Sequence, residues 1–216
     1  MNIINGYKAA FKLGGLDQSQ CITDVISGLA IYVGFYNSIP TVCIEGSHNE
    51  QNWITNFEFI FARWKEFRKA GVKIHSGYLD AWLRIRNQVI ALLPDKTQKI
   101  MVTGYSMGGG VSPIISLDLI YEGYTNIECY AFEGPRVFNR AGKKEFITLV
   151  KNAIGTRYNR DIVPVLPPWY KKIKPYIYPK DNKFKWWKLV SIKDHIGFQS
   201  IDTAILFKDY TNLLLE

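Results

Sequence analysis

The sequence predicts an α/β fold in which helices flank a mainly parallel central sheet that has a small mixed edge. Strand-like runs alternate with helix-like runs along the chain, and this alternation is typical of parallel strands covered on both faces. The early pair of strand-like runs around Asn37-Ser-Ile-Pro40 instead predicts an antiparallel hairpin. With 216 residues, the chain is most simply one domain, residues 1–216, with a single substantial core.

The elements follow from apolar patterning and from the residues that interrupt it. Strands are expected at residues 30–36, 41–45, 99–105, 128–132 and 156–159, with a weaker candidate at 175–178. Helices are expected at residues 18–29, 52–69, 81–93, 107–120, 141–154 and 202–214. Pro94, Gly123 and Gly155 mark helix ends.

The segment Gly104-Tyr105-Ser106-Met107-Gly108 fits the G-x-S-x-G pattern of a nucleophile elbow. It follows a predicted strand and opens a predicted helix, which is the context that the pattern requires, because the serine must sit on a sharp, strained turn. Glycines on either side avoid collisions at that turn. The sequence therefore predicts that Ser106 is the nucleophile of an α/β-hydrolase fold.

The order of residues along the chain suggests the partners of Ser106. In this fold the serine precedes an acid, and the acid precedes a histidine. His195 is the one histidine after Ser106 in the sequence, so it is the expected general base. Asp161 is the favoured acid, because it follows a predicted strand, and the carboxyl ends of strands carry the chemistry of such sheets. The other acids between them are Asp118, Glu122, Glu128, Glu133, Glu145, Asp181 and Asp194.

Six segments resemble, in order, the motifs of one known family. They are Ile44-Glu45-Gly46-Ser47, Asn52-Trp53-Ile54-Thr55-Asn56-Phe57, Val72-Lys-Ile-His75-Ser-Gly77-Tyr78, Phe132-Glu-Gly134-Pro135-Arg136-Val137, Arg160-Asp161-Ile-Val-Pro164 and Asp194-His195. Together they resemble the class 3 lipases, also called fungal-type triacylglycerol lipases. The chain departs from that family's pattern at Glu45, where Arg is usual, at Tyr105 and Met107, where His and Leu are common, and at Asn56, where Asp is usual.

The resemblance implies a serine hydrolase that cleaves carboxylic esters of lipids through a Ser106–Asp161–His195 triad and an acyl-enzyme. A triacylglycerol lipase or a phospholipase A-like enzyme fits the resemblance, and the alternatives are a short-chain carboxylesterase or a catalytically inactive lipid-binding or membrane-binding protein on the same scaffold. The expected oxyanion donors are Met107, through its backbone N–H, and Ser47. Trp53 and Ile54 occupy the place of the family's lid and acyl-binding segment, whereas His75 and Arg136 are expected to be structural braces.

Composition and motif content limit the classes of molecule that the protein is expected to bind. The net charge of +8 is compatible with nucleic-acid binding, but no nucleic-acid module is present, so a lipid or small ester substrate is expected. No metal-ligand spacing occurs, and ester hydrolysis by a triad needs no cofactor. The N-terminal residues do not form a signal-peptide pattern, and the three cysteines suggest no disulfide framework. The expected location is therefore the cytoplasm, with release by another route left open.

Residues 168–188 combine seven lysines with seven aromatic residues and a single acid. This segment lies between the predicted acid and the predicted base. One interpretation is a surface hairpin with solvated lysines. The other is a docking patch for an anionic membrane surface, where Trp and Tyr suit the headgroup region and Lys attracts anionic lipids.

Overall fold

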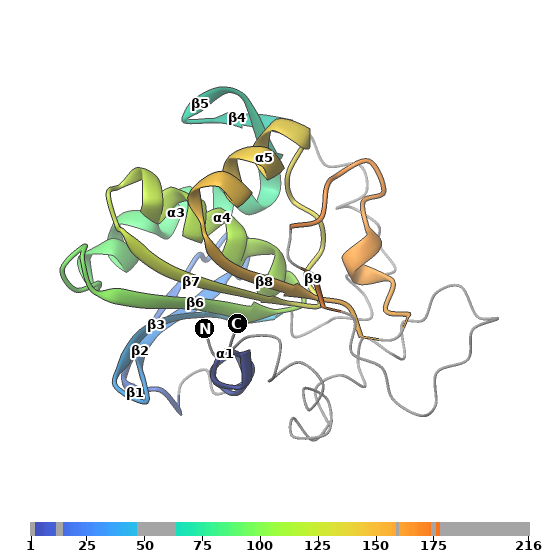
Figure 1. The fold of residues 1–216 in the computed structure, drawn as a ribbon. Coiled ribbons are helices and arrows are strands. Elements are labelled where there is room, and N and C mark those ends of the chain that lie inside the picture. Colours follow the sequence, from blue (N-terminus) through green and yellow to red (C-terminus); the bar gives the residue numbers. More distant parts are fainter. Residues whose placement is uncertain (1–2, 12–14, 47–63, 159, 174–175, 178–216) are drawn as a thin grey trace.

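A seven-stranded sheet, counted over the described residues, forms the centre of the molecule (Figure 1). The computed structural model describes residues 3–11, 15–46, 64–158, 160–173 and 176–177. The strands lie side by side in the order β1 (Asp17–Thr23), β2 (Ala30–Tyr36), β3 (Ile39–Ile44), β6 (Lys99–Tyr105), β7 (Asn126–Phe132), β8 (Asn152–Thr156) and β9 (Tyr176–Ile177).

The sheet is antiparallel at one edge and parallel elsewhere. β2 pairs antiparallel with β1 and with β3, whereas β3, β6, β7, β8 and β9 follow one another in parallel. The mainly parallel sheet with a mixed edge is therefore confirmed, and so is the early hairpin. Its turn residues Asn37 and Ser38 have φ of 49° and 62°, the left-handed values that a type I′ hairpin turn requires.

Helices cover both faces of this sheet and create two cores. Within the described residues, one face carries α3 (Ser76–Ala91), α4 (Met107–Tyr121) and α5 (Arg140–Leu149), and the other carries α1 (Ile3–Ala10) (Figure 1). Successive side chains of β3 alternate between these faces. Val42 and Ile44 join the core beneath α3 and α4, whereas Cys43 joins the core beneath α1 and donates to the Ala9 carbonyl at 3.2 Å. None of the helices in the described ranges is long and apolar enough to cross a membrane.

Strand pairing overturns several predicted helices. Residues 18–29 form β1 and a turn instead, because β1 pairs along its length with β2. The described part of the predicted helix 52–69 is also extended, since β4 (Trp64–Phe67) pairs with β5 (Lys69–His75) in a separate two-stranded sheet. In both places the hydrogen bonds to a neighbouring strand outweigh the local pattern. Residues 52–63 lie outside the described residues.

The boundary between α5 and β8 also differs from the prediction. The helix ends at Leu149, and β8 occupies residues that were expected to complete that helix. Ala153 and Ile154 of β8 are buried in opposite cores, so tertiary burial decides the conformation here. The predicted strand 156–159 therefore begins where β8 ends. The predicted helix 202–214 lies outside the described residues.

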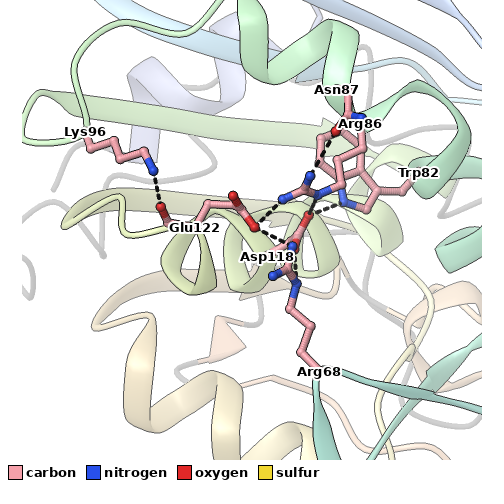
Figure 2. A network of polar contacts seen from close by, with 7 residues as sticks. All are labelled: Arg68, Trp82, Arg86, Asn87, Lys96, Asp118 and Glu122. Carbon is pink, nitrogen blue, oxygen red and sulfur yellow. Dashed lines mark hydrogen bonds and ion pairs between the residues drawn. The ribbon is translucent and has the colours of Figure 1, made fainter.

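Asp118 on α4 forms the centre of a buried ionic network (Figure 2). Its Oδ2 accepts hydrogen bonds from Trp82 Nε1 at 2.8 Å and from Arg86 Nε at 2.6 Å, and its Oδ1 lies 2.7 Å from Arg68 Nε. Glu122 Oε1 lies 2.5 Å from an amino nitrogen of each arginine. The network joins α3, α4 and the β4–β5 turn, which gives Asp118 a structural role.

Replacement of Asp118 by Asn should lower the free energy of unfolding by about 3 kcal/mol, because two guanidinium groups lose their buried counter-charge. Urea denaturation measures this change. Glu122→Gln is the matched control, since Glu122 is partly exposed and its loss should cost about 1 kcal/mol or less. Equal small losses for both variants would show that the network contributes little to stability.

Candidate active site

Ser106 lies on a strained turn between β6 and α4. β6 ends at Tyr105 and α4 begins at Met107, so Ser106 alone makes the reversal. Its φ of 55° and ψ of −120° are unfavourable for a residue with a side chain, and such strain is typical of a nucleophile elbow. The turn is held by a hydrogen bond from the Ser106 N–H to the Phe132 carbonyl at 3.0 Å. Ser106 is fully buried.

Three glycines allow α4 to press directly onto the ends of the strands. A Cβ on Gly108 would lie 2.2 Å from the Ile44 carbonyl oxygen, and one on Gly109 would lie 2.4 Å from the Phe132 carbonyl oxygen. A Cβ on Gly134 would lie 2.2 Å from the carbonyl carbon of Gly109. These are backbone contacts that no side chain can fit. The nucleophile is therefore positioned by contact between main chains.

Asp161 lies in the segment that follows β8, at the same carboxyl edge of the sheet as Ser106. Its side chain is fully buried, and its Oδ1 accepts a hydrogen bond from the Val163 N–H at 2.8 Å. Its backbone is held as well, because its N–H donates to the Tyr158 carbonyl at 2.9 Å and its carbonyl accepts from Arg157 Nε at 2.9 Å. The structure thus has a buried carboxyl group with a fixed backbone at this position, and the role of Asp161 as the acid of a triad stays a prediction.

Arg136 fastens the segment after Asp161, as expected for a brace. Its backbone N–H donates to the Leu166 carbonyl at 2.8 Å, and its Nε donates to the Pro164 carbonyl at 3.2 Å. One terminal nitrogen donates to the carbonyl of Pro168 at 3.1 Å. His75 also has structural contacts: it is the N-cap of α3, and its ring stacks on that of Tyr78 at 4.2 Å between centroids.

Glu133 is a second buried carboxyl at the site. It directly follows β7, is fully buried and has the carboxyl group of Asp161 as a close neighbour. Burial and the charge of Asp161 raise the pKa of Glu133 well above its ordinary value. In the sequence it was only one of several acids between Ser106 and His195. Its position immediately after a central parallel strand was the signal that could have singled it out.

Several predicted site residues fall outside the described part of the chain. His195, Ser47, Trp53 and Ile54 lie there, and so do the alternative acids Asp181 and Asp194. Met107 is described and is the first residue of α4, where backbone N–H groups lack partners within the helix. Among the described residues, no cluster of three or more His, Cys, Asp or Glu side chains could hold a metal ion.

A strained serine between a central parallel strand and a buried helix defines the α/β-hydrolase fold. Solved structures support this fold. A triacylglycerol lipase with a serine-protease triad has a TM-score of 0.80 at 21% identity, covering 94% of this chain and 95% of that one. The mono- and diacylglycerol lipase from Aspergillus oryzae has a TM-score of 0.66 at 26% identity, covering 81% and 66%.

Residues 41–171 match the family model of the class 3 lipases, and the chain belongs to that family. It is 32% identical to the secreted mono- and diacylglycerol lipase 1 of Fusarium solani over 153 residues, which cover 66% of this chain and 44% of the relative. It is 31% identical to a lipase of Rhizomucor miehei over 136 residues, which cover 59% and 37%. The chain thus spans less than half the length of these two relatives.

The comparisons contradict the expected cytoplasmic location. The Fusarium solani relative is a secreted lipase by name, which points to an extracellular location. Two of the three cysteines carry no information on this question, because Cys43 and Cys129 are buried, and burial raises the pKa of the Cys129 thiol to about 12. A buried, protonated thiol stays unreactive in oxidising and reducing compartments alike.

Proposed function

We propose that this chain is a serine hydrolase that cleaves carboxylic esters of lipids, either as a triacylglycerol lipase or as a phospholipase A-like enzyme. The observation that carries the proposal is the strained backbone of Ser106 at the start of a buried helix. Membership in the class 3 lipases and similarity to mono-, di- and triacylglycerol lipases support the substrate class. The buried carboxylate of Asp161 at the same sheet edge supports the triad.

In the proposed mechanism, His195 accepts the proton of the Ser106 hydroxyl while Oγ attacks the ester carbonyl carbon. The resulting tetrahedral intermediate collapses when His195 gives that proton to the departing alcohol, which leaves an acyl group on Ser106. Water then repeats the sequence and releases the fatty acid. Asp161 holds the imidazole in the required tautomer and stabilises its transient positive charge.

The negative charge of the tetrahedral intermediate needs donors that are already in place. The backbone N–H of Met107 is the proposed first donor, since it opens α4 and lies directly after the nucleophile. Ser47 is the proposed second donor, by resemblance to the family's oxyanion residue. Each such donor is typically worth a factor of about 10² to 10³ in turnover. Trp53 and Ile54 are proposed to cover the site and to contact the acyl chain.

Hydrolysis of p-nitrophenyl esters from acetate to palmitate, with and without an interface, tests this function. Cleavage of long-chain esters that increases at an interface supports the lipase, whereas cleavage confined to short soluble esters indicates a carboxylesterase. Fatty-acid release from triacylglycerol emulsions and from phosphatidylcholine vesicles then separates lipase from phospholipase. A folded protein that fails to react with a fluorophosphonate probe would support the inactive lipid-binding alternative and overturn the enzyme.

Residues 168–188 are proposed to bind an anionic membrane surface. In the described part of this segment, Trp169 is 48% exposed and Lys171 is exposed, while most of the remaining residues lie outside the description. Replacing Lys183, Lys185 and Lys188 by Gln should weaken binding to anionic vesicles, by about 1 kcal/mol for each engaged lysine. Hydrolysis of a soluble short-chain ester should be spared. Equal vesicle binding by parent and triple variant at low salt would refute the patch.

A further inference from the structure

The buried carboxyl group of Glu133 has no role in the proposed mechanism. Hydrogen bonds nevertheless hold this group in one orientation. Thr156 Oγ1 donates a hydrogen bond to its Oε1 at 2.7 Å, and the Tyr158 N–H donates to its Oε2 at 2.8 Å. The Glu133 N–H donates in turn to Thr156 Oγ1 at 3.2 Å. Glu133 has a φ of 49°, an unfavourable value for a residue with a side chain. This strained backbone directs a carboxyl group into the interior beside the catalytic acid.

Glu133 and Asp161 cannot both be ionised at this position. The carboxyl group of Asp161 is a close neighbour of that of Glu133, and both residues are fully buried. Two neighbouring carboxylates within a buried site repel each other strongly, so one proton is shared or held by one of them.

The surroundings assign that proton to Glu133. Burial raises its pKa most and the negative charge of Asp161 raises it further, and these effects outweigh the hydrogen bonds from the Tyr158 N–H and the Thr156 hydroxyl, which lower it. Burial is also the main cause that raises the pKa of Tyr7, a residue of α1 near Glu133, to about 12, so Tyr7 remains neutral. Arg157 donates its Nε to the Asp161 backbone carbonyl. The other titratable groups in this segment are Tyr158 and Arg160.

We propose that Glu133 is a positioning residue that stays protonated at neutral pH and donates its O–H to the carboxylate of Asp161. This inference rests on the proposed function, in which Asp161 orients His195. The donated hydrogen bond adds to that from the Val163 N–H and constrains the rotation of the Asp161 carboxylate. Ionisation of Glu133 at higher pH would remove this donor and place a second negative charge against Asp161.

Two substitutions of Glu133 test the role of its proton. Glu133→Gln keeps an N–H donor for Asp161 and a carbonyl acceptor for the Tyr158 N–H, and the Thr156 hydroxyl can turn to accept a hydrogen bond, so turnover at neutral pH should stay close to that of the parent. The alkaline fall in turnover that ionisation of Glu133 causes should be absent from this variant. Glu133→Leu removes the donor and should lower turnover about 10- to 100-fold with little change in the Michaelis constant.

Glu128→Gln is the matched control, because Glu128 lies on β7, the strand that Glu133 follows, is also buried and pairs at 3.1 Å with Lys99, the first residue of β6. Its pH profile should match that of the parent. The inference is overturned if Glu133→Gln loses as much turnover as Glu133→Leu while remaining folded, or if it retains the parent's alkaline fall.

Stability provides a test that does not depend on hydrolysis. Because the pKa of Glu133 is raised in the folded protein, its contribution to stability is complete below the ordinary value of 4.5 and is lost as pH rises through the raised value. The urea midpoint of Glu133→Gln relative to the parent should therefore increase with pH above about 4.5. A difference independent of pH would show that Glu133 is charged when folded. A protein without esterase activity refutes the proposed function but leaves this test intact.

Discussion

Replacing Ser106 by Ala should abolish ester hydrolysis while the protein remains folded. Members of a triad act as a unit, so loss of the nucleophile should lower turnover by about 10⁴-fold or more. Ala is preferable to Gly, because it preserves the strained backbone, whereas Gly would relax a φ of 55° and alter the turn itself. Turnover of a soluble p-nitrophenyl ester and labelling by a fluorophosphonate probe measure the loss.

Ser116→Ala is the matched control for this experiment. Ser116 is also fully buried on α4, and its hydroxyl donates to the Ser112 carbonyl at 2.8 Å, well along the helix from the elbow. Its replacement should leave turnover and probe labelling intact. If Ser106→Ala retained most of the parent's turnover, hydrolysis would have to come from another residue, and the elbow would be a structural turn.

Asp161→Asn should lower turnover by about 10² to 10⁴-fold, because an amide no longer holds the imidazole in the required tautomer or stabilises its charge. The variant should fold, since its side-chain oxygen can still accept the Val163 N–H. Turnover of a soluble ester measures the effect, and urea denaturation verifies the fold. Asp80→Asn is a suitable control, because Asp80 is partly exposed and forms a surface ion pair with Lys65 at 2.5 Å.

Near-normal turnover in Asp161→Asn would reassign the acid. Asp181 would then be the next residue to replace, because it too lies between Ser106 and His195 in the sequence and does not adjoin His195 as Asp194 does. If the variant lost turnover and also unfolded, the expectation that this substitution leaves the protein folded would be wrong.

The elements that the sequence predicted well are those in which local pattern and tertiary contact agree. β2 and β6 have the predicted bounds, and α4 extends one residue beyond its prediction. Their residues are apolar nearly throughout, as expected for strands and helices buried on both sides. The elbow was predicted for a related reason, because glycine spacing and a flanking strand and helix all indicate the same turn.

The elements that were missed depend on partners distant in the sequence. β1 has a polar sequence and is largely exposed, so only its pairing with β2 makes it a strand. The role of Glu133 depends on contacts with residues 156, 158 and 161, which lie on the next strand and beyond it. A local sequence pattern does not show that residue 133 lies beside residues 156, 158 and 161 in the folded protein. The sequence shows which acids are present, but only the packing of the strands shows that Glu133 and Asp161 are buried next to each other.

The glycine contacts around the elbow have a consequence for how the molecule can move. With main chain against main chain at Gly108, Gly109 and Gly134, α4 cannot slide or tilt without disturbing the ends of β3 and β7. We therefore expect the serine to keep one position while other parts of the folded protein rearrange. Any rearrangement that admits a lipid must occur in segments that surround this fixed point, so exchanging those segments should change which esters are accepted while the reacting oxygen stays where it is.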